Sequence, residues 1–379
     1  SYSSVDRALG PGAPLPSEPI PDGYYAHEVT TGPQGQSIKA RLQKPTADLV
    51  EPLRDGQDYA ASTLIAGDGS ITQQWIKALP QKERREQQLA RLLESFREWD
   101  DSPPPRPAPT LDDDAADLLA VYPMGDPHVG MLSWAPETGA SFDLEKAEAL
   151  IIGAFEQLTS KSPRTERAVI ANVGDFFHAD DESATTRRSG HRLDVDSRWA
   201  KVHQAGVRIM VRAIELCLDA HQRVHVICEI GNHDSHSAIM LAAMLAAWFR
   251  NEPRVTIDTS PHNRHYVRFG KCLIGVTHGD TVKPDALGAV MADEAAKAWG
   301  ETTHRWWVTG HVHHMQKKEL LGCTFESFRT LAPRDAWHAR QGYRAGRDMH
   351  RVVLHRLGCE IGRSIVSAAY LQTLYEAES

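Results

Sequence analysis

Short apolar runs alternate with longer amphipathic segments along the chain beyond residue 116. Consecutive apolar residues bounded by Gly, Asp or Asn are typical of buried strands, whereas apolar residues three and four positions apart indicate helices. This alternation predicts an α/β domain with central sheets. We expect strands at 118–122, 168–173, 224–230, 272–277 and 306–309, with further strands within 319–330 and 349–357. We expect helices at 144–159, 197–220, 236–250 and 285–299.

The N-terminal part of the chain differs in composition from the rest. Residues 1–21 are rich in Pro, Ser and Gly and predict a flexible arm. Within 61–77, two stretches with strand character flank a Gly-Asp-Gly turn signal and predict a hairpin, and 82–99 has leucines at helical spacing. Prolines are frequent at 101–109. We therefore expect a linker at 101–115, between a small accessory domain at 22–100 and the main domain at 116–379.

Charge and cysteine content limit the function classes. The formal net charge of -8 argues against binding nucleic acid through overall charge, although a local basic groove is still compatible with it. The cysteines form no CxxC pair and most lie in apolar runs, so we expect buried thiols in a reducing compartment. The first residues show no signal-peptide pattern, and the longest apolar run, 239–249, is too short to span a bilayer. We therefore expect a cytoplasmic protein without a membrane partner.

A cluster of polar residues follows each of the five strands expected between 118 and 309. Open α/β sheets place their sites in the loops at the carboxyl ends of strands. Asp-x-His and His-x-His put two side chains on the same side of an extended segment, and an adjacent glycine permits a sharp turn. The clusters are Gly125-Asp126-Pro127-His128, Gly174-Asp175, Gly231-Asn232-His233-Asp234, Thr277-His278-Gly279-Asp280 and Gly310-His311-Val312-His313.

The residue types in these clusters indicate a metal site. Asp and Asn oxygens together with His nitrogens suit Mn, Fe, Zn or Ni better than Ca or Mg alone. A carboxylate can bridge two metals about 3.5–4 Å apart, an arrangement that activates water and holds the entering and leaving oxygens of a phosphate. Turn and capping roles would explain any single cluster. Five clusters in order, each after a strand, favour the metal interpretation.

In this order the clusters resemble the signature of the calcineurin-like metallophosphoesterases, over about 118–314. The resemblance implies an α/β fold of four layers, two packed β-sheets flanked by helices, and a hydrolase in which hydroxide between two divalent transition metals attacks phosphorus. Mn is the metal we expect first, with Fe, Zn, Ni or Co as alternatives. It also implies that His233 faces the scissile phosphate and protonates the leaving oxygen or stabilises the transition state. The implied ligands are Asp126, His128, Asp175 and His313 for the first metal, with Asp175 as the bridge, and Asn232, His278 and His311 for the second.

Two narrower resemblances bear on the substrate. Segments 192–198, 278–283 and 326–331 resemble sequence motifs found in phage and prophage members of the family. His178, in Gly-Asp-Phe-Phe-His, stands where several phosphatases of the family have an Asp that orients the catalytic histidine, whereas SbcD-type DNA nucleases have a similar Gly-Asp-x-Phe-His. The resemblance implies that His178 contacts a phosphodiester. The alternative is a buried histidine that hydrogen-bonds the loop.

An arginine-rich segment, 180–199, follows the second cluster and should lie near the metals. Guanidinium groups suit phosphate oxygens, so we expect a substrate-binding loop. The alternative is a solvated loop whose acidic residues pair with its arginines. The candidate substrate-binding residues are Arg187, Arg188, Arg192 and Arg198.

Together these features predict a phosphodiesterase dependent on two metals, nuclease-like and of phage or prophage type, with DNA as the expected substrate. A phage-encoded enzyme of this kind would act in the host cytoplasm. The first alternative is a phosphomonoesterase, or a phosphodiesterase for cyclic nucleotides or other small molecules. The second is a metal-binding scaffold for protein interactions, without catalysis.

Overall fold

The computed structural model divides the chain into two units, Ser1–Glu98 and Trp99–Ser379. It describes 105–378 except 162, 187–189, 341 and 343, together with four strands of the first unit. The arm expected at 1–21, the helix expected at 82–99 and residues 101–104 lie outside the described residues. The four strands form two antiparallel pairs, of which the second confirms the hairpin predicted within 61–77: β1 (Tyr24–Gly32) with β2 (Gly35–Leu42), and β3 (Tyr59–Ile65) with β4 (Ile71–Ala78).

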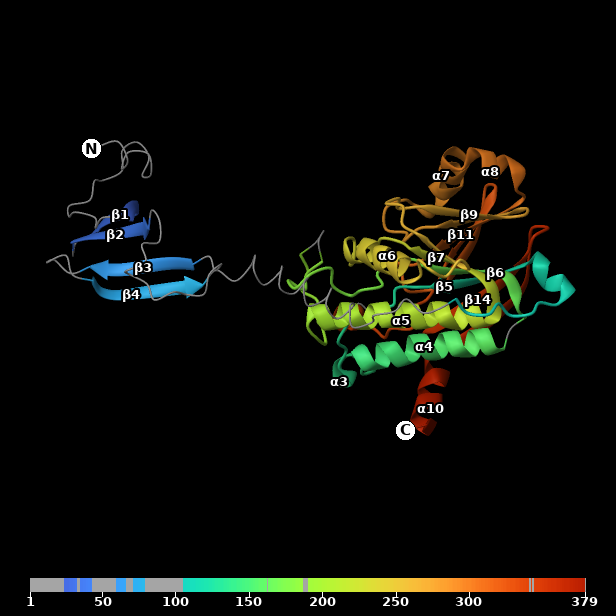
Figure 1. Ribbon diagram of the computed structural model, residues 1–379, viewed down its shortest axis with the longest axis horizontal. Helices are drawn as coiled ribbons and strands as arrows, with labels where there is room; N and C mark the ends of the chain where they lie inside the picture. Colours follow the sequence, from blue (N-terminus) through green and yellow to red (C-terminus); the bar gives the residue numbers. More distant parts are fainter. Residues whose placement is uncertain are drawn as a thin grey trace. The chain divides into compact units, whose positions relative to one another are not determined.

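A six-stranded mixed sheet carries the first three polar clusters (Figure 1). Its order is β15-β14-β5-β6-β7-β8, with β5 to β8 parallel and β14 and β15 antiparallel at one side. Every residue of β5 is buried, which explains why its sequence is a continuous apolar run and not an alternating one. The strands are β5 (Leu118–Met124), β6 (Thr165–Asn172), β7 (His221–Cys228), β8 (Val255–Asp258), β14 (Asp348–His355) and β15 (Cys359–Ser367).

A five-stranded sheet carries the other two clusters. Its order is β12-β13-β11-β10-β9, in which β10, β11 and β13 are parallel and the two edge strands run antiparallel. Because β10 and β11 are parallel neighbours, their carboxyl ends lie at the same edge of the sheet. The strands are β9 (His265–Phe269), β10 (Cys272–Val276), β11 (His304–Thr309), β12 (Gln316–Leu320) and β13 (Cys323–Ser327).

The two sheets pack face to face through one apolar core. Side chains from both sheets meet in it, among them Val121 and Val169 from the first and Ile274 and Val308 from the second. A second cluster, which includes Met291 and Trp307, lies between the outer face of the five-stranded sheet and the helices that cover it. This confirms the expected α/β sandwich of two packed sheets flanked by helices.

Helices cover both outer faces of the sandwich. In Figure 1, α4 and α5 run along the six-stranded sheet, whereas α7 and α8 lie beyond the five-stranded sheet. Asp143 caps α4, because its side chain accepts a hydrogen bond from the Lys146 amide at 2.9 Å. The described helices are α3 (Ala135–Thr138), α4 (Leu144–Ser160), α5 (Trp199–Ala220), α6 (Ser237–Trp248), α7 (Leu287–Glu294), α8 (Ala296–Glu301), α9 (Ala336–Arg340) and α10 (Ala368–Glu378), with short 3-10 turns at Asp113–Asp117 and Pro284–Ala286.

Two sequence predictions need correction. The single helix expected at 285–299 is two helices, broken at Ala295, whose backbone has φ -117° and ψ 37°. Apolar side chains of both halves, Met291 and Trp299, pack against the same sheet, and this tertiary packing overrides helix propensity. The region 319–330, expected as strand, contains the end of β12 and the whole of β13. The two strands are antiparallel, because the chain turns between them at Gly322, where φ is 83°.

The thiols that the structure describes are buried, and none of them forms a disulfide. Cys217, Cys228, Cys272 and Cys323 lie in the core, as their apolar sequence context predicts. Burial raises the pKa of the Cys228 thiol to about 12, so this group stays protonated near neutral pH. The side chain of Cys359 is outside the described residues.

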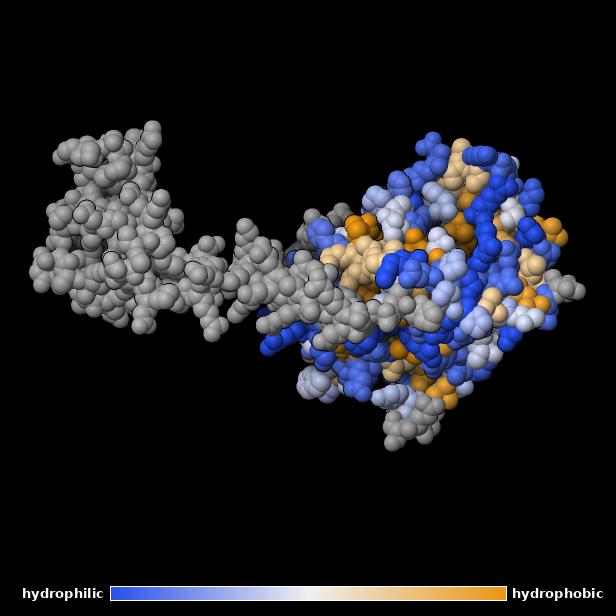
Figure 2. Space-filling model, in the orientation of Figure 1, coloured by the Kyte–Doolittle hydropathy of each residue, from blue (hydrophilic) through white to orange (hydrophobic). Residues whose placement is uncertain are grey.

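On the face shown in Figure 2, hydrophobic residues lie in small groups among hydrophilic ones. Isolated apolar side chains at a surface are ordinary and indicate no binding site by themselves. Within the described part of the chain, none of the helices has both the length and the apolar character needed to cross a bilayer.

A buried histidine makes the fold sensitive to acid. The His221 side chain has no exposed surface and lies between two hydroxyls, Tyr122 Oη at 2.8 Å from Nε2 and Thr165 Oγ1 at 2.7 Å from Nδ1. Since the Thr165 hydroxyl donates to the carbonyl of Arg167, it accepts from Nδ1, and Tyr122 donates to Nε2. Burial, helped by the charge of Arg351, lowers the pKa of His221 to about 3.

We expect the free energy of unfolding to fall as the pH drops below about 6.5, the ordinary pKa of histidine. Between that value and the folded pKa of about 3, His221 binds a proton only when the chain is unfolded. The free energy of unfolding therefore falls by up to about 1.4 kcal/mol for each pH unit in this window. Above about pH 6.5 His221 is neutral in both states, and no stability is lost. Urea unfolding in EDTA at pH 7 and pH 5 measures the effect. His221→Gln should flatten the pH dependence and exposed His262→Gln should not; equal slopes in all three chains would contradict the prediction.

Candidate metal centre

The five polar clusters meet where the carboxyl ends of the two sheets come together. The amide of His311, after β11, donates to both carboxylate oxygens of Asp126, after β5, at 2.9 and 3.0 Å. The Nδ1 atom of His278, after β10, lies 2.9 Å from the carbonyl oxygen of Val173, after β6. Hydrogen bonds of this kind join the loops of one sheet to those of the other, so the clusters form a single site.

Five of the expected ligands have a left-handed backbone. Among the described residues, positive φ angles outside glycine occur at Ala184 and at these five. Such a conformation costs about 1 kcal/mol or more for a residue with a side chain and is typical of functional sites. The fold therefore bends the chain at the positions whose side chains the sequence marks as ligands. They are Asp126 (41°), His128 (46°), Asp175 (50°), His311 (65°) and His313 (54°).

The first group of donors comprises Asp126, His128 and His313. The Nε2 atoms of the two histidines are 3.1 Å apart, and His313 Nε2 is 3.9 Å from Asp126 Oδ1. Asp126 is fully buried and His128 is 3% exposed. Thr330 donates its hydroxyl to the carbonyl oxygen of Asp126 at 2.6 Å, which fixes this loop.

The second group comprises Asp175, Asn232, His278 and His311. Three donor atoms surround His278 Nε2, namely Asn232 Oδ1 at 2.9 Å, His311 Nδ1 at 3.2 Å and Asp175 Oδ2 at 3.3 Å. Because His278 Nδ1 is engaged by the Val173 carbonyl, Nε2 is the nitrogen directed at the other donors. A histidine held in this way is typical of metal sites, where the second ring nitrogen donates to a carbonyl.

Two glycines let the backbone come close to the carboxylates. A Cβ atom at Gly231 would lie 2.1 Å from Asp175 Oδ1, and one at Gly310 would lie 2.5 Å from Asp126 Oδ2. Neither distance can be relieved by a flexible side chain, because both carboxylates are buried and held by hydrogen bonds. Glycine is therefore required at these two motif positions, where the backbone passes a carboxylate of another loop.

The two buried carboxylates are electrostatically different. Burial raises the pKa of Asp126, whereas in Asp175 burial is outweighed by the neighbouring His278, which holds the pKa of that carboxyl well below its usual range. Burial lowers the pKa of His278, but Asp175 and Asp126 together raise it well above 6.5. His278 thus supplies positive charge between two carboxylates. A cation is the species that this pocket favours, and a bound metal would take the place of the proton.

The donor chemistry fits a pair of divalent transition metals. Carboxylate, amide and imidazole atoms converge from five loops, and apolar strands surround them. Two sets of described residues have ligand atoms within 4.8 Å of one another, His128 with His178 and His233, and Asp175 with His278 and His311. The second set coincides with ligands predicted from the sequence. The first contains only His128 of the predicted ligands, because His178 and His233 pack against its ring.

His233 is oriented by the main chain. Its amide donates to Asp175 Oδ1 at 2.7 Å, and its Nδ1 is 2.8 Å from the carbonyl oxygen of His178. A carbonyl can only accept, so Nδ1 carries a proton and Nε2 faces away from this bond. Because this contact is made by the main chain, any residue at position 178 could supply the carbonyl that orients His233.

The side chain of His178 is 1% exposed and packs against the ring of His128. Its Nδ1 is 3.2 Å from His128 Nδ1, and its ring stacks on His233 with 5.3 Å between centroids. These contacts show a histidine that packs against two site residues. Its contact with a phosphodiester stays a prediction.

Main-chain hydrogen bonds join the arginine-rich segment to the first metal loop, which is the loop after β5 that carries Asp126 and His128. The Leu132 amide donates to the Asp194 carbonyl at 2.9 Å, and the Asp196 amide to the Gly130 carbonyl at 3.0 Å. Arg192 and Arg198 are exposed, and neither has an ion pair with a carboxylate among the residues that the structure describes. Arg187 and Arg188 lie outside the described residues. Substrate binding by the four arginines stays a prediction.

Asp234 has a structural role that the motif alone did not assign. It is fully buried, and its carboxylate accepts from three amides, those of Asp175 (3.2 Å), Phe177 (3.1 Å) and Gly231 (3.0 Å). It therefore fixes the two loops that carry Asp175 and His233. Its place as the last residue of Gly-Asn-His-Asp is the signal that could have identified it.

No family model matches this chain, and no curated protein matches it. Similar solved structures include a conserved uncharacterized protein from Streptococcus pneumoniae, described as a predicted phosphoesterase, with 11% identity, a TM-score of 0.27 and coverage of 66% of this chain and 98% of that one. Vps29 from Entamoeba histolytica complexed with Zn²⁺ has 14% identity, a TM-score of 0.29 and coverage of 66% and 99%. A structure of PhoD has 7% identity, a TM-score of 0.33 and coverage of 69% and 70%. Identities and TM-scores this low identify no function, so the inference depends on the side chains of this chain.

Proposed function

We propose that the chain is a metal-dependent phosphoesterase that hydrolyses phosphodiesters. The observation that carries the proposal is the convergence of seven buried or half-buried donors in two adjoining groups, between which Asp175 is the proposed bridge. Carboxylate, amide and imidazole ligands around a shared carboxylate are characteristic of two-metal hydrolytic sites. When bound, two divalent transition metals would supply an activated water and neutralise charge on the phosphate.

The chain's own residues have separable roles in this proposal. Asp126, His128, Asp175 and His313 would hold the first metal, and Asn232, His278 and His311 would join Asp175 at the second. His233 keeps the Nδ1 proton on the His178 carbonyl and presents Nε2 to the substrate. From there it donates a proton to the leaving oxygen or a hydrogen bond to the phosphate in the transition state.

A diester, and DNA in particular, is the substrate class that we propose. Arg192 and Arg198 support it, because they are exposed on a segment that is hydrogen-bonded to the first metal loop. The resemblance of Gly-Asp-Phe-Phe-His to the nuclease motif supports the same class. A phage-type enzyme working in the cytoplasm is part of this proposal, and a phosphomonoesterase is the alternative.

A substrate panel tests the proposal directly. The full chain loaded with Mn²⁺ should hydrolyse bis(p-nitrophenyl) phosphate with a higher kcat/KM than p-nitrophenyl phosphate, and EDTA should abolish both activities. Single- and double-stranded DNA, RNA and cyclic nucleotides then define the physiological class. Preference for the monoester would establish the phosphatase alternative. Stoichiometric metal binding without hydrolysis of any ester would support the alternative of a metal-binding scaffold without catalysis.

A further inference from the structure

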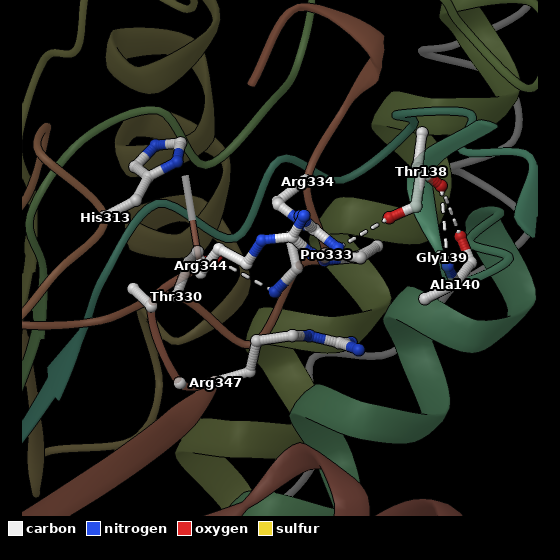
Figure 3. A pocket seen from close by; sticks show the side chains of 12 residues that line it. Thr138, Gly139, Ala140, His313, Thr330, Pro333, Arg334, Arg344 and Arg347 are labelled. Atoms are coloured by element: carbon white, nitrogen blue, oxygen red, sulfur yellow. Dashed lines mark hydrogen bonds between the residues drawn. The ribbon is translucent and has the colours of Figure 1, made fainter. Parts of the chain in front are cut away.

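A pocket of about 200 Å³ adjoins the metal centre on the side of His313 (Figure 3). One wall is the end of α3 and the turn after it, residues 138–140, and the other is formed by two segments of the loop between β13 and β14. His313 belongs both to this lining and to the first donor group. A molecule with a phosphate at the candidate metal centre would therefore have room to extend into the pocket.

The lining of this pocket has an unbalanced charge. Three of its twelve residues are arginines, Arg334, Arg344 and Arg347, and none is acidic. In Figure 3 their side chains lie between His313 and residues 138–140. Three like charges in one hollow repel one another, and an anion bound among them would relieve the repulsion. The contrast with the net charge of -8 for the whole chain indicates a local feature.

Main-chain carbonyls hold two of these arginines in place. Arg334 Nη2 donates to the Thr138 carbonyl at 3.0 Å, and Arg347 donates Nε and Nη2 to the Leu331 carbonyl at 2.9 and 2.6 Å. The Leu331 carbonyl fixes the Arg347 guanidinium without neutralising it. Burial lowers the pKa of Arg347 to about 10, which still leaves this group charged at neutral pH.

Arg344 is exposed at the pocket and has no hydrogen-bond or ion-pair partner among the residues that the structure describes. Arg340, the last residue of α9 in the same connection between β13 and β14, is instead paired with Glu137 at 3.2 Å and does not line the pocket. The loop therefore carries one arginine with a structural partner and another that faces the pocket without one. This pair offers a matched comparison.

We propose that the pocket binds a second phosphate of the substrate, so that the preferred diester carries a further phosphate group, as a 5′-phosphorylated nucleotide strand does. The inference rests on the proposed function, because the His313 side of the pocket is where the scissile phosphate would lie. Guanidinium groups form paired, charge-assisted hydrogen bonds with phosphate oxygens, and three of them suit a doubly charged terminal phosphate.

The kinetic test compares two thymidine dinucleotides, with and without a 5′-phosphate, in the Mn²⁺-loaded full chain. The 5′-phosphate should raise kcat/KM by about 10-fold or more, the range of charge-assisted hydrogen bonds. Arg344→Gln should reduce this ratio towards one, whereas Arg340→Gln, which removes the same charge outside the pocket, should keep it. Equal kcat/KM for the two dinucleotides in the unsubstituted chain would overturn the proposal.

A binding test separates this inference from the proposed function. In EDTA, calorimetry should show that the 5′-phosphorylated dinucleotide binds about 10-fold more tightly than the other, and Arg344→Gln should remove the difference. This result would stand even if the chain hydrolysed no ester. Equal binding of the two dinucleotides would refute the proposal that the pocket binds a second phosphate. Tight binding of inorganic phosphate without discrimination between them would show a site for the free ion and would refute it too.

Discussion

Asp175→Asn is expected to lower kcat for bis(p-nitrophenyl) phosphate by at least about 1,000-fold. The Asp175 carboxylate lies 3.3 Å from His278 Nε2 in the second donor group, and the main-chain carbonyl of Asp175 accepts from the amide of His128 in the first at 3.0 Å. An amide has one oxygen and no charge, so it cannot bridge two cations, and the pair of metals is lost. Metal analysis of the dialysed protein should show the stoichiometry falling from two ions per chain to one or none.

The matched control is Asp117→Asn, which removes an exposed carboxylate at the opposite, amino end of β5, where Asp117 pairs with Arg356. It should retain two metals and full activity. Circular dichroism of both variants establishes that the fold persists. Full activity in Asp175→Asn, with two metals still bound, would contradict the assignment of Asp175 as the residue that bridges the two metals.

His233→Gln is expected to slow the reaction to an extent that depends on the leaving group. If His233 Nε2 protonates the leaving oxygen, a dinucleotide, whose leaving alkoxide is a strong base, should lose about 100- to 10,000-fold in kcat. p-Nitrophenolate leaves without a proton, so bis(p-nitrophenyl) phosphate should lose far less. Both metals should remain bound, since the ligands are untouched.

His236→Gln is the control, because His236 is a nearby exposed histidine whose Nδ1 contacts Asp180 at 2.9 Å, outside the donor groups. It should leave both substrates unaffected. An equal loss for the two leaving groups in His233→Gln would assign His233 to transition-state stabilisation. Loss of a metal ion in that variant would contradict its proposed place beside the metals.

The sequence predicts the buried strands well and the edge strands poorly. β5 and β10 are apolar and buried throughout, and β6, β7 and β11 are largely buried in their second halves, where their apolar residues lie. β8 is four residues long, and β15 exposes Ile361 and Ile365 by 53% and 59%, so neither has the pattern of a buried strand. Tertiary packing that breaks a helix at Ala295 has no local signal either.

The candidate ligands could be predicted because each follows the carboxyl end of a strand by no more than four residues and lies within three residues of a glycine. Contacts made by the main chain could not, and the orientation of His233 by the carbonyl of residue 178 is one of these. The arginine pocket was missed for a different reason. Sequence shows several arginines between 329 and 347 but does not show which of them, like Arg340, have a carboxylate partner.

The left-handed backbone at five of the expected ligands has a consequence for how ions would bind. Only the folding of the two sheets against each other holds these residues in a conformation that an unfolded chain rarely visits. The conformational cost of assembling the site is therefore met during folding, before an ion arrives. Metal uptake would then involve loss of water and protons with little movement of the main chain, and the centre behaves as a rigid, pre-organised receptor.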